Sequence, residues 1–285
     1  MVEDSETVNE FQRRCRRDKF KVTFKKECAM KTIIWKTGVL LFAVFVLTVS
    51  CSVKSDEFKA LQQQVGQMSN QLGILEDVHA IRKLQHAYGY YLDKCLYKEV
   101  VDLFADDGEA IFVGGVFKGK DKGVRRLYID GFSQGFAKGV NGPVHGLLLE
   151  HFQIQDIVDV APDRQTAKAR FRCFMQAGTH KSTMDSKQAG APMQWWEGGM
   201  YENTYVKENG IWKIKVLNYH PVWHADYATG WANTRLNYVS PATETYPKNP
   251  GGPDELVQPP PTLWPNTDVI PYHYAHPVTG EVWKQ

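Results

Sequence analysis

The chain has 285 residues and a formal net charge of only +2 at pH 7. Hydrophobic residues make up 43% of it and aromatic residues 12%, a composition that excludes an intrinsically disordered protein. The basic residues crowd positions 13–26, and the part after residue 51 holds slightly more acidic than basic side chains. We therefore expect no nucleic-acid partner for the folded part.

A basic leader, residues 1–29, precedes a segment that has the features of an export signal. After Met30, two lysines come before an uncharged apolar stretch at 38–49, and residues 47–51 (Leu-Thr-Val-Ser-Cys) resemble the bacterial lipobox. Small residues there let a signal peptidase approach the backbone, and the Cys51 thiol would accept the lipid. Translation would then start at Met30, with the leader an over-extended gene start.

Three fates remain open for residues 30–51. They form a lipoprotein signal with lipidated Cys51, a single membrane-spanning anchor held by the positive-inside rule, or a plain cleaved signal. Each of them places the domain outside the cytoplasm, and the first two attach it to a membrane.

Residues 52–74 form a predicted helical stalk. Apolar side chains alternate at spacings of three and four, which is the pattern of a coiled-coil seam: Phe58, Leu61, Val65, Met68, Leu72 and Leu75. The stalk either joins copies of the chain in a homo-oligomer or lies on its own domain.

Residues 75–226 carry the pattern of one domain of about 150 residues, enough for a single core. A helix continues to about residue 93, and helices follow at 98–104 and 122–136 around a strand at 109–117. Strands are predicted at 145–160, 166–178, 199–207 and 211–220, the last two joined by Glu208-Asn209-Gly210. Helices followed by antiparallel strands indicate an α+β fold, and no phosphate-binding glycine motif is present.

Residues 227–285 are rich in proline and aromatic side chains. Proline excludes regular helix and central strand, while the aromatic content argues against a disordered tail. We expect an extended arm that packs on the domain or on a neighbouring subunit.

Several side chains are candidates for chemistry. Tyr88, Tyr91 and Asp93 close the first helix of the domain, where burial among aromatic rings would tune a carboxyl group as an acid or base; the alternative is an exposed Asp93 beside core tyrosines. His145 stands at the start of a long strand, as a ligand-facing or a structural residue, and His151 is left unassigned. Cys95 and Cys173 are expected in the core, since no metal-ligand spacing is present.

A pocket lining is predicted from the later strands. One of the adjacent tryptophans, assigned as Trp196, would line the pocket together with Tyr201. Trp212, Ile214, Val216, Asn218 and His220 are assigned to one strand face, with Asn218 and His220 as its polar end.

Three segments together resemble the SnoaL-like domain of the nuclear transport factor 2-like superfamily: residues 75–93, 103–108 (Leu-Phe-Ala-Asp-Asp-Gly) and 205–214. The resemblance covers about residues 72–226. It implies a curved antiparallel or mixed sheet wrapped by N-terminal helices into a cone with an internal cavity.

The scytalone dehydratase and bile-acid 7α-dehydratase branches carry Tyr, Asp and His at positions that match Tyr88, Asp93 and His145. The resemblance implies a lyase without cofactor or metal, acting on an aromatic or polycyclic hydroxylated compound. One departure is that residues 171–175 offer no second active-site histidine. Two alternatives remain: an isomerase of the ketosteroid type and a domain that only binds its ligand.

Overall fold

The computed structural model describes residues 13–14, 55–183, 194–234, 241–266 and 268–283. The chain forms two compact units, residues 1–70 and residues 71–285. The predicted signal segment with Cys51, and the leader apart from residues 13–14, lie outside the described residues. Among the helices that the structure describes, none combines the length and hydropathy that a bilayer crossing requires.

The first helix covers residues 55–93, of which 71–93 belong to the second unit. Its buried side chains in that unit recur every three or four residues, which is the spacing of one helix face: Asp77, Ile81, Gln85, Tyr88 and Leu92. All six apolar side chains of the predicted coiled-coil seam are more than half exposed, at 56–68%. The seam is therefore open to a partner.

Short helices and hairpin strands follow. They are α2 (Tyr97–Asp102), β1 (Phe104–Phe112), β2 (Gly115–Lys118), the π-helical segments Gly119–Val124 and Arg126–Ser133, and α3 (Gln134–Ala137). The strand predicted at 109–117 is thus two strands, because Val113 and Gly114 both have positive φ, 43° and 76°, and turn the chain between them.

Four long strands build the rest of the sheet: β3 (Leu147–Val160), β4 (Thr166–Thr179), β5 (Gln194–Glu208) and β6 (Ile211–Asp226). With β7 (Glu255–Leu256) the order is β3-β4-β5-β6-β1-β2-β7. Strands β1 and β6 are parallel and the other neighbours are antiparallel. The predicted α+β fold with a mixed sheet and an N-terminal helix is confirmed.

A β-bulge in β6 decides which side chains reach the core. Tyr205 pairs with Ile214 but Thr204 pairs with Val216, so Lys215 is an extra residue. One extra residue moves every later side chain to the opposite face, because strand side chains alternate. The side chains that point to the core are therefore those of Trp212, Ile214, Leu217 and Tyr219. The prediction that Asn218 and His220 share the face of Trp212 and Ile214 is wrong for this reason.

A second bulge follows in β6. Gly198 pairs with Trp223 and Gly199 pairs with Pro221, which leaves Val222 as the extra residue. The alternation shifts once more, and His224 is buried while Val222 is exposed. The two bulges together bring Tyr219 and His224 to the same interior.

A buried polar group ties the first helix to the sheet. The side-chain Nε2 of Gln85 donates to Gln153 Oε1 on β3 at 2.7 Å. The side-chain Oε1 of Gln85 accepts from the Tyr205 hydroxyl at 2.7 Å and from Asn203 Nδ2 at 3.0 Å. The partners come from two strands, β3 and β5, so these bonds fix the position of the helix on the sheet while satisfying the buried amides.

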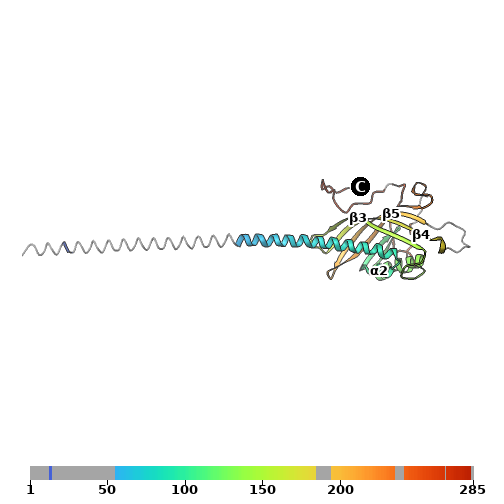
Figure 1. Cartoon of the computed structure of the whole chain (residues 1–285), viewed down its shortest axis with the longest axis horizontal. Coiled ribbons are helices and arrows are strands. Elements are labelled where there is room, and N and C mark those ends of the chain that lie inside the picture. The colour runs from blue at the N-terminus through green and yellow to red at the C-terminus, as the bar shows by residue number, and fades with distance from the viewer. Residues whose placement is uncertain (1–12, 15–54, 184–193, 235–240, 267, 284–285) are drawn as a thin grey trace, which may run out of the picture. The chain divides into compact units, whose positions relative to one another are not determined.

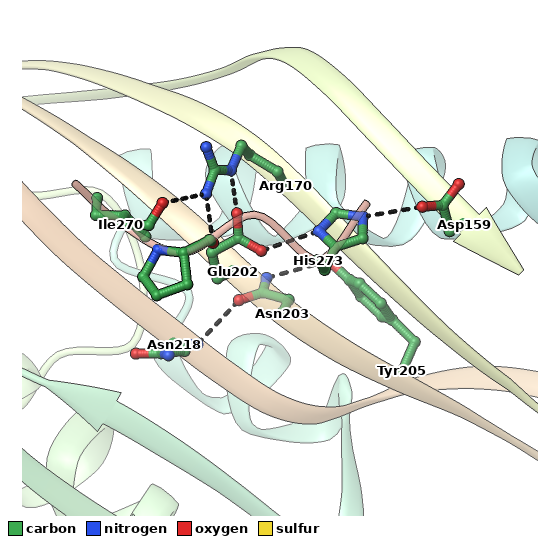
Figure 2. A network of polar contacts seen from close by, with 9 residues as sticks. Asp159, Arg170, Glu202, Asn203, Tyr205, Asn218, Ile270 and His273 are labelled. Atoms are coloured by element: carbon green, nitrogen blue, oxygen red, sulfur yellow. Dashed lines mark hydrogen bonds and ion pairs between the residues drawn. The ribbon is translucent and has the colours of Figure 1, made fainter. Parts of the chain in front are cut away.

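Several described residues of the C-terminal arm contact the chain's own domain (Figure 1), among them Trp264, whose backbone N–H donates to the Val222 carbonyl oxygen at 2.7 Å. Figure 2 shows the anchor: Arg170 of β4 pairs with Glu202 and donates to the carbonyl oxygens of Ile270 and Pro271 at 3.0 and 2.7 Å. His273 lies between Glu202, at 3.0 Å, and Asp159, at 3.5 Å. The Arg170 side chain is only 8% exposed. Glu202 neutralises its charge, and the two carbonyl oxygens of the arm accept its remaining hydrogen bonds.

Candidate active site

A cavity of about 220 Å³ lies between the first helix, the π-helical segment Arg126–Ser133 and the sheet. Most of its lining is apolar or aromatic, as in Leu92, Phe112, Phe132, Met175, Trp195 and Tyr201. Known ligand pockets measure about 300–1,000 Å³, so this cavity suits a small molecule of one or two rings. Two carboxylate–imidazole pairs contribute to its wall.

The first pair joins the helix to β3. Asp93 Oδ1 lies 3.0 Å from His151 Nδ1 and accepts the backbone N–H of His151 at 2.7 Å. The two side chains are only 10% and 14% exposed. A carboxylate beside Nδ1 holds the proton on that nitrogen and leaves Nε2 as the basic atom. An imidazole in this tautomer can accept a proton at Nε2, and His151 belongs to the cavity wall.

His145, which the sequence analysis assigned to this role, is exposed in a turn before β3. His145 is six positions before His151, an even number, so a continuous strand would point both side chains to the same face. The strand, however, begins only at Leu147. Because His145 precedes the alternating part of the chain, its side chain does not contribute to the cavity wall. The structure brings Asp93 together with His151 and not with His145.

Tyr88 lies at the base of the cavity, among other tyrosines. Its hydroxyl is 2.9 Å from that of Tyr128, and its ring meets that of Tyr201 edge to face at 5.7 Å. Burial raises the pKa of Tyr88, Tyr128 and Tyr201 well above the ordinary value of a phenol. These hydroxyls therefore remain protonated at neutral pH. Tyr88 and Tyr201 line the cavity, so their hydroxyls are the ones that can donate a hydrogen bond to an oxygen of a ligand.

The second pair joins β5 to β6. Glu197 Oε2 lies 2.7 Å from His224 Nδ1, and the Tyr219 hydroxyl donates to Glu197 Oε1 at 2.5 Å. Burial raises the pKa of Tyr219, so it too stays protonated. Gly199 leaves room for this arrangement, since a Cβ there would lie 2.5 Å from the Tyr219 hydroxyl oxygen.

Sequence reasoning missed His151, Glu197, Tyr219 and His224. The alternation within β5 places Glu197 on the face of Trp195 and Tyr201, and this signal could have identified it. No such signal exists for Tyr219, because its orientation depends on the bulge at Lys215. His224 was missed because the strand is predicted to end at residue 220; the two bulges cancel, and alternation from Trp212 puts it on the core face.

Of the other predicted lining residues, Tyr201 contributes to the cavity wall. Tyr91 is half-buried against the core outside it. Trp196 lies on the opposite face of β5 and stacks on Tyr227 at 5.7 Å. The backbone N–H of Asn218 donates to Asn203 Oδ1 at 2.9 Å, and burial lowers the pKa of His220. Neither Asn218 nor His220 contributes to the wall.

A wider hollow of about 600 Å³ lies at one end of β3, β4 and β5. Its described lining includes Trp195, Trp196 and Tyr227, together with His180 and Lys181, but no acidic side chain. It lacks the paired acid and base of the smaller cavity, so we place the candidate site in the smaller one.

Cysteine and metal chemistry have little support in the described part of the chain. Cys95 and Cys173 are buried and unbridged, and burial raises the pKa of Cys173 to about 12. A thiol with such a pKa is not a nucleophile at neutral pH. No three His, Cys, Asp or Glu side chains among the described residues are grouped to hold a metal ion.

The fold and the cavity define a class: α+β domains that enclose a small apolar chamber between a helix and a curved sheet. The family model described as the SnoaL-like domain matches residues 73–218, and the chain belongs to this family. The resemblance stated from the sequence is thereby confirmed. A search of the curated proteins found no match.

Three of the solved structures that resemble the chain are from Novosphingobium species. A protein assigned as a scytalone dehydratase from Novosphingobium aromaticivorans is 22% identical, covering 54% of this chain and 89% of its own, with a TM-score of 0.39. A hexachlorocyclohexane dehydrochlorinase, LinA-type3 from Novosphingobium barchaimii, is 15% identical over 56% and 97% of the two chains, with a TM-score of 0.43. An NTF2-like protein with a cystatin-like fold from N. aromaticivorans is 21% identical over 53% and 86%, with a TM-score of 0.38.

Proposed function

We propose that the domain is a lyase of the dehydratase type that acts on a small hydroxylated aromatic or bicyclic compound. The observation that carries this proposal is His151 in the wall of an apolar cavity, with Asp93 bonded to its Nδ1 from outside the lining. A carboxylate and an imidazole that are both nearly buried are costly to maintain, and burial of this kind is concentrated at functional sites.

The mechanism follows from the positions of the side chains. His151 Nε2 takes a proton from a carbon next to a carbonyl group, and Asp93 stabilises the imidazolium that forms. Negative charge then develops on the carbonyl oxygen, where a tyrosine hydroxyl, Tyr88 in our proposal, donates a hydrogen bond. Loss of hydroxide as water from the neighbouring carbon completes the elimination. All of these groups are side chains, so the reaction needs no cofactor.

The test uses 3-hydroxy-1-tetralone, whose dehydration gives 1-naphthol, an absorbing product. We expect Asp93→Asn and His151→Gln to lower kcat/KM by about 10²-fold or more, the usual contribution of general base catalysis. His145→Gln is the matched control and keeps wild-type turnover, because that side chain is exposed in a turn. Undiminished turnover in both Asp93→Asn and His151→Gln would remove the pair from the chemistry.

An isomerase of the ketosteroid type is the second candidate, because a base and a cluster of protonated tyrosines also suffice to move a double bond. Conversion of 3-cyclohexen-1-one to its conjugated isomer, with no activity on the hydroxytetralone, would decide for it. A domain that only binds would bind both probes and convert neither.

We further propose that the domain is exported and held at a membrane through residues 30–51. The support is the order of lysines, apolar stretch and Leu-Thr-Val-Ser-Cys motif. Incorporation of labelled palmitate that is lost in Cys51→Ala would support lipidation. Membrane extraction of the unlabelled full-length chain would instead indicate a spanning anchor, and a protein released without lipid would indicate a plain signal.

A further inference from the structure

The Glu197–His224 pair is not needed to remove a proton, since Asp93 and His151 already supply a base. It comes from β5 and β6, whereas the first pair comes from the helix and β3. Both side chains are nearly buried, at 12% and 10% exposure, and both belong to the cavity wall. The chamber therefore holds two separate groups that can exchange protons with a ligand.

The strands depart from regular geometry at this second pair. The bulge at Val222 turns His224 inward, and Gly199 makes the space that the Tyr219 hydroxyl occupies next to Glu197. An apolar wall would avoid the desolvation of a carboxylate, which is costly even when it is paired. These features point to a role for the pair beyond packing.

We propose that His224, positioned by Glu197, is the proton donor to the departing hydroxyl group, an inference that rests on the proposed function. Hydroxide is a poor leaving group, and protonation by a positioned acid makes it leave as water. Glu197 Oε2 holds the ring at Nδ1, which leaves Nε2 as the atom that can transfer a proton, and Tyr219 holds the other carboxylate oxygen. Glu197 and Tyr219 are positioning residues, and His224 is the catalytic one.

The step balances without a further reactant. His151 takes the proton from carbon, and the electrons of that C–H bond form the new C=C bond. The electrons of the C–O bond stay on oxygen, which receives the proton of His224 and leaves as water. Exchange with solvent returns one proton to His224 and removes one from His151. The substrate class is thus a β-hydroxy ketone whose two reacting carbons face opposite walls.

The experiment separates the two proton transfers by running the reaction of 3-hydroxy-1-tetralone in D₂O. Removal of the C2 proton is followed as deuterium in recovered substrate, and elimination as 1-naphthol. We expect His224→Gln and Glu197→Gln to lose elimination by about 10²-fold while retaining exchange, because the enolate then returns to substrate. His151→Gln loses both. Retained exchange also reports that the variants fold, since it requires an intact Asp93–His151 pair.

The leaving group supplies a matched control. Fluoride departs with little help from an acid, so on 3-fluoro-1-tetralone the two variants are expected to lose less than about 10-fold. Wild-type elimination in His224→Gln and Glu197→Gln, or an equal loss of exchange and elimination in properly folded variants, overturns the assignment of His224. A wild-type protein that shows neither reaction overturns the proposed function itself, which is a different result.

Discussion

Asp77 offers a prediction about stability whose magnitude follows from the structure. This carboxylate is 5% exposed and accepts from Arg164 at 2.6 Å, Lys207 at 2.5 Å and the Trp212 indole at 2.9 Å. It thereby ties the helix to the β3–β4 turn and to β5 and β6. Gly73 allows this, because a Cβ at that position would lie 2.0 Å from the Arg164 guanidinium.

The size of the effect follows from the pKa. Burial alone would raise it, but the hydrogen bonds from Arg164, Lys207 and Trp212 outweigh burial and lower the pKa of Asp77 from 3.8 to about 2. A shift of this size corresponds to about 2 kcal/mol of folding free energy. Because the pKa is lower in the folded state, this stability is present above pH 4 and is lost as the pH falls from about 4 to about 2.

The assay is urea unfolding of the wild type and Asp77→Asn at pH 7 and pH 3. We expect Asp77→Asn to unfold with about 2 kcal/mol less free energy at pH 7 and about half that deficit at pH 3. Glu244→Gln, which breaks the exposed pair with Lys248, is the control and changes stability by less than about 0.5 kcal/mol. A deficit that is the same at both pH values would refute the reasoning.

Three further predictions concern other parts of the fold. Gly199→Ala should displace Tyr219 and cost about 1–3 kcal/mol in thermal unfolding, whereas Gly135→Ala, with open space around its Cβ, should not destabilise; equal effects would contradict this. Arg170→Gln should release the arm, seen as faster proteolysis within residues 268–283, while the exposed Arg172→Gln should not; an unchanged cleavage rate would show that the arm is held elsewhere. Leu61→Glu with Met68→Glu should reduce a homo-oligomer to monomers in light scattering, and an unchanged mass would exclude the seam as the contact.

The elements with regular patterns could be predicted from the sequence. The strand at 166–178 alternates apolar and basic residues and was placed within one residue of β4 (Thr166–Thr179). The strand predicted from Gly199 begins five residues after the start of β5 at Gln194, so that Gly198 falls outside the prediction. In the structure both glycines lie inside the strand and leave room for Trp223 and Tyr219. The reason for these two glycines is the space that side chains distant in sequence require, which the local sequence does not show.

The site was predictable only in part for the same reason. Helical spacing predicts that Asp93 lies at the helix end, five residues after Tyr88. Strand alternation predicts that Tyr201 faces the cavity. The partner of Asp93 depends on where β3 begins, and this boundary separates His151 from the exposed His145. The orientation of Tyr219 depends on the bulge at Lys215, which no local pattern in the chain indicates. The bulge at Val222 restores the original alternation, so His224 lies on the face of Trp212 and Ile214, but the strand is predicted to end before it, at residue 220.

The most direct test of the account is a crystal structure of the full-length protein with 1-tetralone, which has the carbonyl group but no leaving group. We expect the ketone in the cavity of about 220 Å³, with its C2 carbon about 3–3.5 Å from His151 Nε2 and its oxygen at a tyrosine hydroxyl. A ketone bound in the wider hollow beside Trp196, or one whose C2 faces away from His151, would contradict the assignment of this pair as the base.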